Sequence, residues 1–294
     1  MIDQKITGAE ALIKSLLAEG VDTVFGYPGG AIIPVYDVLY GYTDKLRHIL
    51  VRHEQAATHA AQGYARVTGR VGVALVTSGP GATNTITGIT DALMDSTPMV
   101  VISGQTDSKG LGTDAFQETD VIGITQPVTK WNYQVRRAED IPWAVSRAFY
   151  IASSGRPGPV VLDVTKDAQN GKLDWTYEKC NYIRSYDPDP EISSLAVSEA
   201  ADLINGAERP LIIAGRGVMI SQAENELLAL AEKADIPVIN TLLGLSTIPS
   251  DHHLYKGMAG MHGNVGANVA TNACDVLIAV GMRFDDRVTG DCST

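Results

Sequence analysis

Short apolar runs alternate with helix-like segments along most of this chain, and this alternation most limits what it can fold into. A first helix is predicted from a capping box, Thr7 followed by Glu10, with Gly20 as its C-terminal stop. Further helices are predicted over residues 54–66, 197–203, 224–233 and 265–271. Strands are predicted over residues 21–25, 48–51, 71–76, 98–103, 159–164, 211–214, 236–240 and 276–280. Strands separated by helices predict an α/β fold of doubly wound, mostly parallel sheets.

A loss of this rhythm divides the chain. Residues 166–190 show no clear period and end in the proline-rich run Tyr186-Asp187-Pro188-Asp189-Pro190, which is typical of a linker. With 294 residues the chain is long enough for two domains, each with its own core. We expect a first domain over residues 1–167, a linker over 168–190 and a second domain over 191–294.

Composition excludes several classes of protein. The chain has 45% hydrophobic and 19% charged residues, as globular proteins do, and no apolar run reaches the roughly 20 residues that span a bilayer. The N-terminus has no secretory pattern, and a net charge of −11 argues against a nucleic-acid partner. Cys180, Cys274 and Cys292 lack the spacing of disulfides or of a zinc site. We expect a cytoplasmic protein with no membrane or nucleic-acid partner.

Three features gather where the first predicted strands end, which is where open α/β sheets bind ligands. Residues 26–30 (GYPGG) follow the first strand, Glu54 follows the second, and residues 78–84 (SGPGATN) follow the third. Glycines let a backbone approach a ligand closely, and helix starts present free N–H groups. Neither loop matches GxGxxG or GxxxxGK[ST], so a nucleotide is not predicted. Glu54 alone would be interpreted as a helix-capping carboxylate, but beside these loops it becomes a candidate for chemistry.

The segments VFGYPGGAI, RHEQAATHAAQGYAR and TSGPGATN resemble the pyrimidine-binding domain of thiamine-diphosphate enzymes. Four further segments narrow the resemblance to the acetolactate synthase (acetohydroxyacid synthase) family, and they cover residues 112–118, 155–159, 163–167 and 281–290. The resemblance extends over the whole chain. It implies that residues 1–167 form the pyrimidine-binding domain and that residues 191–294 belong to a central FAD-binding domain.

The resemblance also implies an activity, that of a transferase with thiamine diphosphate, structural FAD and Mg²⁺ as cofactors. In the family, the glutamate that matches Glu54 hydrogen-bonds N1′ of the aminopyrimidine and so promotes loss of the proton from C2 of the thiazolium. Pyruvate is then decarboxylated, and its two-carbon remainder is joined to pyruvate or 2-ketobutyrate. This step leads to valine, leucine and isoleucine.

Other positions take their roles from the same resemblance. The aminopyrimidine would be lined by Tyr27, Pro28, Gly29, Pro80 and Asn84. The reacting substrates would meet Phe116, Gln117, Lys166 and Arg283, the last of which would hold the carboxylate of the acceptor. The flavin would meet Arg156, Gly215, Arg216, Gly217, Thr241, Leu242, Met261, His262, Gly281, Asp285 and Arg287. Without the resemblance, these would be interpreted as turn, core or surface residues.

Two departures limit the resemblance. Residues 106–109 (TDSK) replace the small or proline-containing segment that follows Gly104-Gln105 in many members, so inhibitor sensitivity is not carried over. The family's third domain carries a Gly-Asp-Gly word and a later Asn that hold Mg²⁺ and the diphosphate, and the sequence shows no such pair. No metal ligand is therefore predicted in this chain. We expect residues 191–294 to be a truncated central domain and the chain alone to be inactive.

Family active sites form between subunits, so a homodimer or homotetramer is expected, with a small regulatory subunit as a further partner. Two alternatives stay open. One is a relative such as pyruvate oxidase, which shares the architecture but uses its flavin for electron transfer. The other is a naturally short, noncatalytic chain that binds FAD or pairs with a full-length partner.

Overall fold

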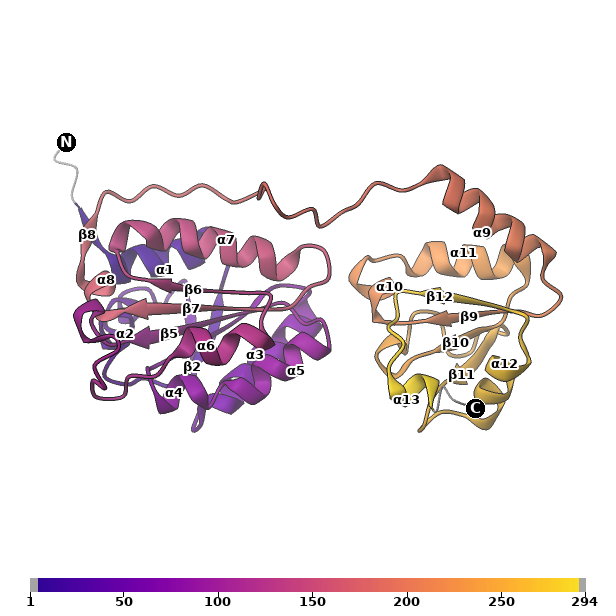
Figure 1. Ribbon diagram of the computed structural model, residues 1–294, viewed down its shortest axis with the longest axis horizontal. Helices are drawn as coiled ribbons and strands as arrows, with labels where there is room; N and C mark the ends of the chain where they lie inside the picture. Colours follow the sequence, from indigo (N-terminus) through magenta and orange to yellow (C-terminus); the bar gives the residue numbers. More distant parts are fainter. Residues whose placement is uncertain (1–4, 291–294) are drawn as a thin grey trace. The chain divides into compact units, whose positions relative to one another are not determined.

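A computed structural model describes residues 5–290, and the chain divides after Pro190 into two compact units (Figure 1). Each unit is a parallel sheet with helices on both faces, so the predicted doubly wound α/β class is confirmed. Residues 168–190, predicted as a linker, belong to the first unit. Cys292 lies outside the described residues.

The first unit is built on a six-stranded parallel sheet of order β3-β2-β4-β5-β7-β6. Its strands are β2 (Thr23–Gly26), β3 (Arg47–Leu50), β4 (Gly72–Val76), β5 (Met99–Gln105), β6 (Trp131–Val135) and β7 (Pro159–Thr165). All residues of β4, β5 and β7 are buried, as expected for strands covered on both faces. Because β3 lies on one side of β2 and β4 on the other, the topological switch point falls between β2 and β4, where such sheets bind ligands.

Helices cover both faces of this sheet (Figure 1). One face packs against α1 (Gly8–Ala18), α2 (Ile33–Tyr40), α7 (Ile141–Ser153) and α8 (Lys166–Asn170). The other face packs against α3 (Glu54–Thr68), α4 (Pro80–Thr83), α5 (Ile86–Met94) and α6 (Val121–Thr125). Two short strands, β1 (Ile6–Thr7) and β8 (Lys172–Leu173), pair antiparallel beside the main sheet. Single 3₁₀ turns form η1 (Ser108–Gly110), η2 (Gln126–Val128) and η3 (Ala138–Asp140).

Local sequence fixes the ends of the helices. The Thr7 hydroxyl accepts a hydrogen bond from Glu10 N at 3.2 Å and caps α1, as the capping box predicts. The α3 helix begins at Glu54 after the N-cap His53, and it ends at Gly69, whose φ of +70° is the left-handed conformation that favours glycine. Glu54 therefore lies at the first position of a helix that directly follows a parallel strand.

The second unit is a four-stranded parallel sheet of order β11-β10-β9-β12. Its strands are β9 (Pro210–Ala214), β10 (Val238–Asn240), β11 (Tyr255–Met258) and β12 (Val276–Val280). Its helices are α9 (Ser194–Gly206), α10 (Arg216–Ile220), α11 (Glu224–Ala234), α12 (Val265–Ala273) and α13 (Asp286–Thr289), with a 3₁₀ turn η4 (Leu242–Gly244). Two apolar clusters, one on each face, form its core. Of the strands in the two main sheets, β6 and β11 are absent from the sequence prediction.

Within residues 5–290, no helix combines the length and the apolar character that crossing a membrane requires.

Candidate active site

Glu54 is a buried carboxylate at the carboxyl edge of the first sheet. Its residue is 8% exposed, and Asn84 Nδ2 donates a hydrogen bond to Glu54 Oε2 at 2.8 Å. Asn84 follows the short helix α4 and is 30 positions away in sequence. The amide therefore holds one oxygen of the carboxylate in place from a different loop.

The loops after β2 and β4 meet around Thr77. Thr77 Oγ1 accepts a hydrogen bond from Ala31 N at 3.2 Å. A Cβ atom on Gly29 would lie 2.5 Å from Thr77 Cγ2, and one on Gly81 would lie 2.7 Å from the same atom and 3.5 Å from Glu54 Oε1. Both glycines are thus needed for close approach, and the two predicted glycine loops and Glu54 converge at the switch point.

The outer wall of this edge is accessible to solvent. Tyr27 is 42% exposed, Pro28 and Pro80 are exposed, and a Cβ on Gly30 would meet no atom within 4 Å. An apolar ring and two proline rings therefore face open space beside the buried carboxylate. Such a surface suits the flat face of a bound heterocycle.

Tyr36 is a neighbour of Glu54 that sequence reasoning missed. Its hydroxyl donates to Leu75 O at 3.0 Å and lies 3.3 Å from His48 Nε2. Burial, and next the charge of Glu54, raise the pKa of Tyr36 well above its ordinary value, so the phenol stays protonated. No sequence pattern marks this residue, because Tyr36 lies within an apolar helix and would be interpreted as a core residue.

The loop between β5 and α6 brings two more predicted residues to the same edge. Phe116 is 89% exposed, and Gln117 has a φ of +56°. A Cβ on Gly79 would lie 2.6 Å from Gln117 O, so this loop packs directly on the loop that leads to Asn84. Lys166, half-buried, begins α8 immediately after β7 and also lies at the carboxyl edge.

Arg156 lies at the opposite edge of this sheet. It precedes β7, and its guanidinium donates to Ser96 Oγ at 2.7 Å and to Met94 O at 3.2 Å, at the C-terminal end of α5. The structure therefore does not bring Arg156 together with Glu54. Its assignment to the flavin stays a prediction.

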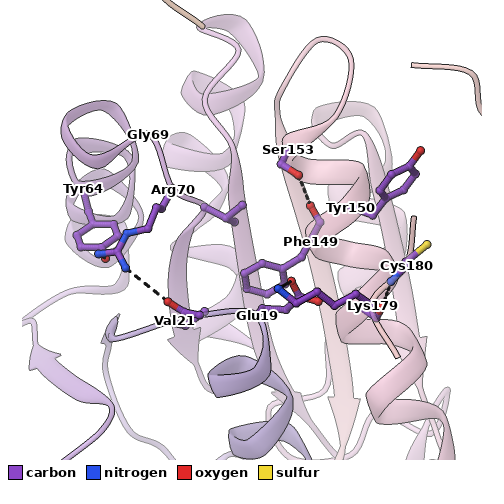
Figure 2. Close-up of a pocket in the computed structure, with 13 residues that line it drawn as sticks. Glu19, Val21, Tyr64, Gly69, Arg70, Phe149, Tyr150, Ser153, Lys179 and Cys180 are labelled. Atoms are coloured by element: carbon purple, nitrogen blue, oxygen red, sulfur yellow. Dashed lines mark hydrogen bonds and ion pairs between the residues drawn. The ribbon is translucent and has the colours of Figure 1, made fainter. Parts of the chain in front are cut away.

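A cavity of about 320 Å³ also opens at the amino edge, between segments that precede β2 and β4 and the C-terminal part of α7 (Figure 2). Its charged residues have partners: Arg70 Nη2 lies 2.7 Å from Asp22 Oδ2, and Lys179 Nζ lies 3.7 Å from Glu19 Oε2. Both cations, Arg70 and Lys179, are therefore paired with carboxylates. The cavity is separate from the Glu54 site and shows no group aimed at a ligand.

In the second unit, the loops after β9 and β12 interlock through glycine. Gly215 N donates to Val280 O at 2.8 Å, and Gly217 N donates to Gly281 O at 2.7 Å. A Cβ on Gly215 would lie 2.5 Å from Gly281 O, and Gly281 has a φ of +60°. Only glycine allows this contact between two strand ends. Arg216, the first residue of α10, lies in the same loop.

A buried amide lies at the end of β10. Asn240 is fully buried, and its Nδ2 donates to Gly244 O and to Thr247 Oγ1, while its Oδ1 has no hydrogen-bond partner among residues 5–290. Thr241 and Leu242 follow directly, and the Leu242 side chain is 65% exposed. A buried oxygen without a hydrogen-bond donor lowers the stability of the fold unless a ligand or water donates to it. No sequence pattern predicts this role for Asn240.

The remaining predicted residues gather after β11 and β12. Met261 N donates to Arg287 O at 2.7 Å, and Asp285 caps α13 by accepting from Arg287 N at 3.0 Å. Arg283 Nη2 lies 3.1 Å from Asp285 Oδ2. His262 is exposed beside Met261. The carboxyl ends of all four strands of this unit thus carry predicted flavin residues.

No cluster of three or more His, Cys, Asp or Glu side chains able to hold a metal ion occurs between residues 5 and 290.

Comparison with known proteins shows the family of the chain. The family described as thiamine pyrophosphate enzyme, N-terminal TPP binding domain, matches residues 6–124, and the thiamine pyrophosphate enzyme central domain matches residues 197–294. The chain therefore belongs to the thiamine pyrophosphate enzymes. Within them it is similar to acetolactate synthase large subunits, so the resemblance inferred from the sequence is confirmed.

Three relatives illustrate the similarity. The acetolactate synthase large subunit of Corynebacterium glutamicum is 53% identical over 99% of this chain and 46% of its own length. The probable acetolactate synthase large subunit of Methanocaldococcus jannaschii is 53% identical over 97% and 48%, and the Haemophilus influenzae large subunit is 47% identical over 98% and 50%. The chain spans about half the length of the curated relatives it matches.

Proposed function

We propose that this chain supplies the aminopyrimidine side of an acetolactate synthase active site. The reaction decarboxylates pyruvate and joins the two-carbon remainder to pyruvate or 2-ketobutyrate, in the cytoplasmic synthesis of branched-chain amino acids. The observation that carries this proposal is Glu54, buried at the switch point of the first sheet with one oxygen held by Asn84. The identity to acetolactate synthase large subunits supports the choice of reaction.

Glu54 and Asn84 have different roles toward the cofactor: Asn84 positions the carboxyl group, and Glu54 contacts the ring. The Asn84 amide fixes Glu54 Oε2 at 2.8 Å, and this leaves Oε1 to meet a ring nitrogen of the aminopyrimidine. A carboxyl group in hydrogen-bond contact with that nitrogen shifts protons on the ring. Thiamine diphosphate, when bound, supplies the acidic C2–H and the electron sink for decarboxylation. Tyr27, Pro28, Gly29 and Pro80 form the wall beside it.

The residues after β5 and β7 would meet the substrate. The Phe116 ring is exposed and free to pack on a methyl group, and the Gln117 amide can orient a carbonyl or hydroxyl oxygen. Lys166 adds a cation at the same edge. Arg283, in the second unit, carries a planar guanidinium suited to a carboxylate, and its present partner is Asp285.

We propose that the second unit binds FAD. Its glycine loops keep the backbone free of side chains at the ends of β9 and β12, and Asn240 Oδ1, which has no partner within residues 5–290, offers an acceptor. The residues proposed to hold FAD there are Gly215, Arg216, Gly217, Thr241, Leu242, Met261, His262, Gly281, Asp285 and Arg287. Arg156, in the first unit, is proposed as a flavin residue from the sequence resemblance alone. The flavin is structural, because the net reaction transfers no electrons.

Magnesium and the diphosphate complete the proposed set of cofactors. The chain spans about half the length of the curated relatives that it matches. We propose that Mg²⁺ is held by other residues of the active protein and that a second subunit completes the site. We propose a homodimer or homotetramer, with a small regulatory subunit as a further partner.

The test is a pyruvate assay of the active protein without an electron acceptor. Acetolactate as the product supports the proposal. Acetate or acetyl phosphate with reduction of the flavin would assign the chain to a pyruvate oxidase-like reaction. Binding of FAD without any thiamine-dependent turnover would assign it to a noncatalytic FAD-binding subunit.

A further inference from the structure

Four polar side chains lie side by side in the apolar centre of the first sheet: Ser103, Gln105, Gln134 and Asp163. The strand register pairs Asp163 with Ser103 on one neighbour and with Gln134 on the other, so their side chains share one face. Asp163 is fully buried, and its carboxylate accepts from Ser103 Oγ at 2.7 Å, Gln134 Nε2 at 3.0 Å and Gln105 Nε2 at 3.1 Å. Burial raises the pKa of Asp163, and these donors favour its charged form.

Gln105 connects this cluster to the loop that carries Phe116 and Gln117. Its Nε2 also donates to Thr119 O at 3.0 Å, and its Oε1 accepts from Thr106 N at 2.9 Å. Thr106 and Thr119 are the two ends of the segment 106–119, so the fully buried side chain of Gln105 hydrogen-bonds both ends. We call these two hydrogen bonds the clip. Because the Asp163 carboxyl accepts from Gln105 Nε2, it favours the Gln105 amide orientation in which the nitrogen points toward Thr119 O and the oxygen toward Thr106 N.

The segment 106–119 is also tied at its tip and side. The Glu118 carboxylate accepts from Thr113 N at 3.3 Å, Ala115 N at 3.2 Å and Gly112 N, and these backbone donors lower the pKa of Glu118. Ser108 N and Oγ both donate to Asp167 Oδ1 at 3.1 Å. The tip is therefore closed locally, and the clip at Gln105 joins its base to the sheet.

We propose that Asp163 is a positioning residue that acts through Gln105 to hold the segment 106–119 at the carboxyl edge. The consequence is the placement of Gln117, whose backbone lies against Gly79 in the loop that leads to Asn84. The effect on substrate rests on the proposed function of Phe116 and Gln117. The placement of the segment does not rest on it.

Limited trypsin cleavage of the 294-residue chain tests the clip, because Lys109 in η1 gives the segment a cleavage site. Gln105→Met keeps the length of the side chain but removes both loop contacts. We expect cleavage after Lys109 to rise at least about tenfold, since two hydrogen bonds that oppose local opening are lost. Ser103→Ala removes a donor to the same carboxylate without touching the loop, and we expect it to change cleavage less than about twofold.

Asp163→Asn tests whether the carboxylate acts through Gln105. The substituted amide no longer fixes the Gln105 orientation, so cleavage after Lys109 should rise as in Gln105→Met. In the double variant it should rise no further, since one interaction has been removed twice. Multiplied effects, or unchanged cleavage in Gln105→Met, would overturn the proposal. If Asp163→Asn is cut throughout the chain because it unfolds, the Gln105→Met and Ser103→Ala pair decides alone.

Kinetics of the active enzyme separate positioning from general stability. Gln105→Met should raise the KM for pyruvate about tenfold while the half-saturating thiamine diphosphate concentration stays within about twofold, because the Glu54–Asn84 pair does not involve Gln105. Ser103→Ala should change neither. Faster cleavage with an unchanged KM would support the clip and contradict the proposed role of Phe116 and Gln117. A parallel rise in both constants would indicate a merely structural role and overturn the proposal.

Discussion

The two units share an architecture but equip the carboxyl edges of their sheets differently. In the first unit the edge holds a buried carboxylate, Glu54, whose partner is a neutral amide. In the second unit the charged side chains are more exposed and pair with each other, as Arg283 (50% exposed) does with Asp285 (27% exposed). Both parallel sheets offer a site at their carboxyl edge, and the burial of the side chains at that edge determines which chemistry the site suits. A sheltered carboxylate suits proton transfer, whereas an open glycine cradle suits ligand binding.

The largest expected effect is the loss of turnover when the buried carboxylate of the first unit, Glu54, is replaced. Glu54→Gln keeps the shape and the contact with Asn84 but removes the carboxyl group that exchanges a proton with the ring. We expect acetolactate formation by the active enzyme to fall at least about 100-fold, or about 2.7 kcal/mol in activation free energy. Asp22→Asn, at the amino edge, is the matched control and should stay within about threefold. Unchanged turnover in Glu54→Gln would remove this residue from the mechanism.

A substitution in the second unit should cost stability. Gly281 has a φ of +60°, and a Cβ there would lie 2.5 Å from Val218 N. We expect Gly281→Ala to lower the unfolding free energy of this unit by about 2 kcal/mol, seen as faster hydrogen exchange in β9 and β12. Gly206→Ala, where a Cβ meets nothing within 4 Å, should not accelerate exchange. Equal exchange in the two variants would show that the glycine contact is not required.

Asn84→Ala tests whether the buried carboxylate needs its amide partner, because it leaves Glu54 in place without the hydrogen bond from Asn84. A hydrogen bond to a charged group contributes about 1.5 kcal/mol, so we expect turnover to fall about tenfold. In the Glu54→Gln background the same substitution should have a smaller effect, because the two residues act as a pair. The measurement is a double-mutant cycle on kcat. Full additivity would mean that Asn84 does not act through Glu54.

The smallest expected effect concerns Arg283. Arg283→Ala should weaken use of the acceptor about fivefold more than pyruvate decarboxylation, because it removes a guanidinium proposed to hold the acceptor carboxylate. Product partitioning with 2-ketobutyrate as acceptor measures this ratio. Arg209→Ala, paired at the amino edge with Glu208, serves as the control. Equal loss of both steps would assign Arg283 to flavin binding or folding instead.

Much of the fold could be predicted from the sequence, because the burial of a strand determines the pattern of apolar residues along it. β4, β5 and β7 are covered on both faces, so they read as continuous apolar runs. β6 and β11 were missed, because polar residues or Gly257 interrupt them and each strand is only part-buried at the edge of its sheet. The edge strands β3 and β12 were predicted, because they keep an apolar run.

The candidate site was predicted in part. Glu54 and the two glycine loops were found because carboxyl edges of parallel strands collect ligands. The partners Tyr36 and Asp163 were not, because a polar residue in an apolar segment shows its role only through contacts distant in sequence. The pairing of Asp163 with Gln105 spans 58 positions and depends on strand order, which local patterns do not encode.

The most direct test is the rate at which the C2 proton of bound thiamine diphosphate exchanges with deuterium, followed by NMR in the active enzyme and in Glu54→Gln. We expect fast exchange in the enzyme and exchange at least about 100-fold slower in the variant, with the cofactor still bound in both. Equal exchange rates with the cofactor bound would contradict the claim that the buried carboxylate of the first unit activates the cofactor.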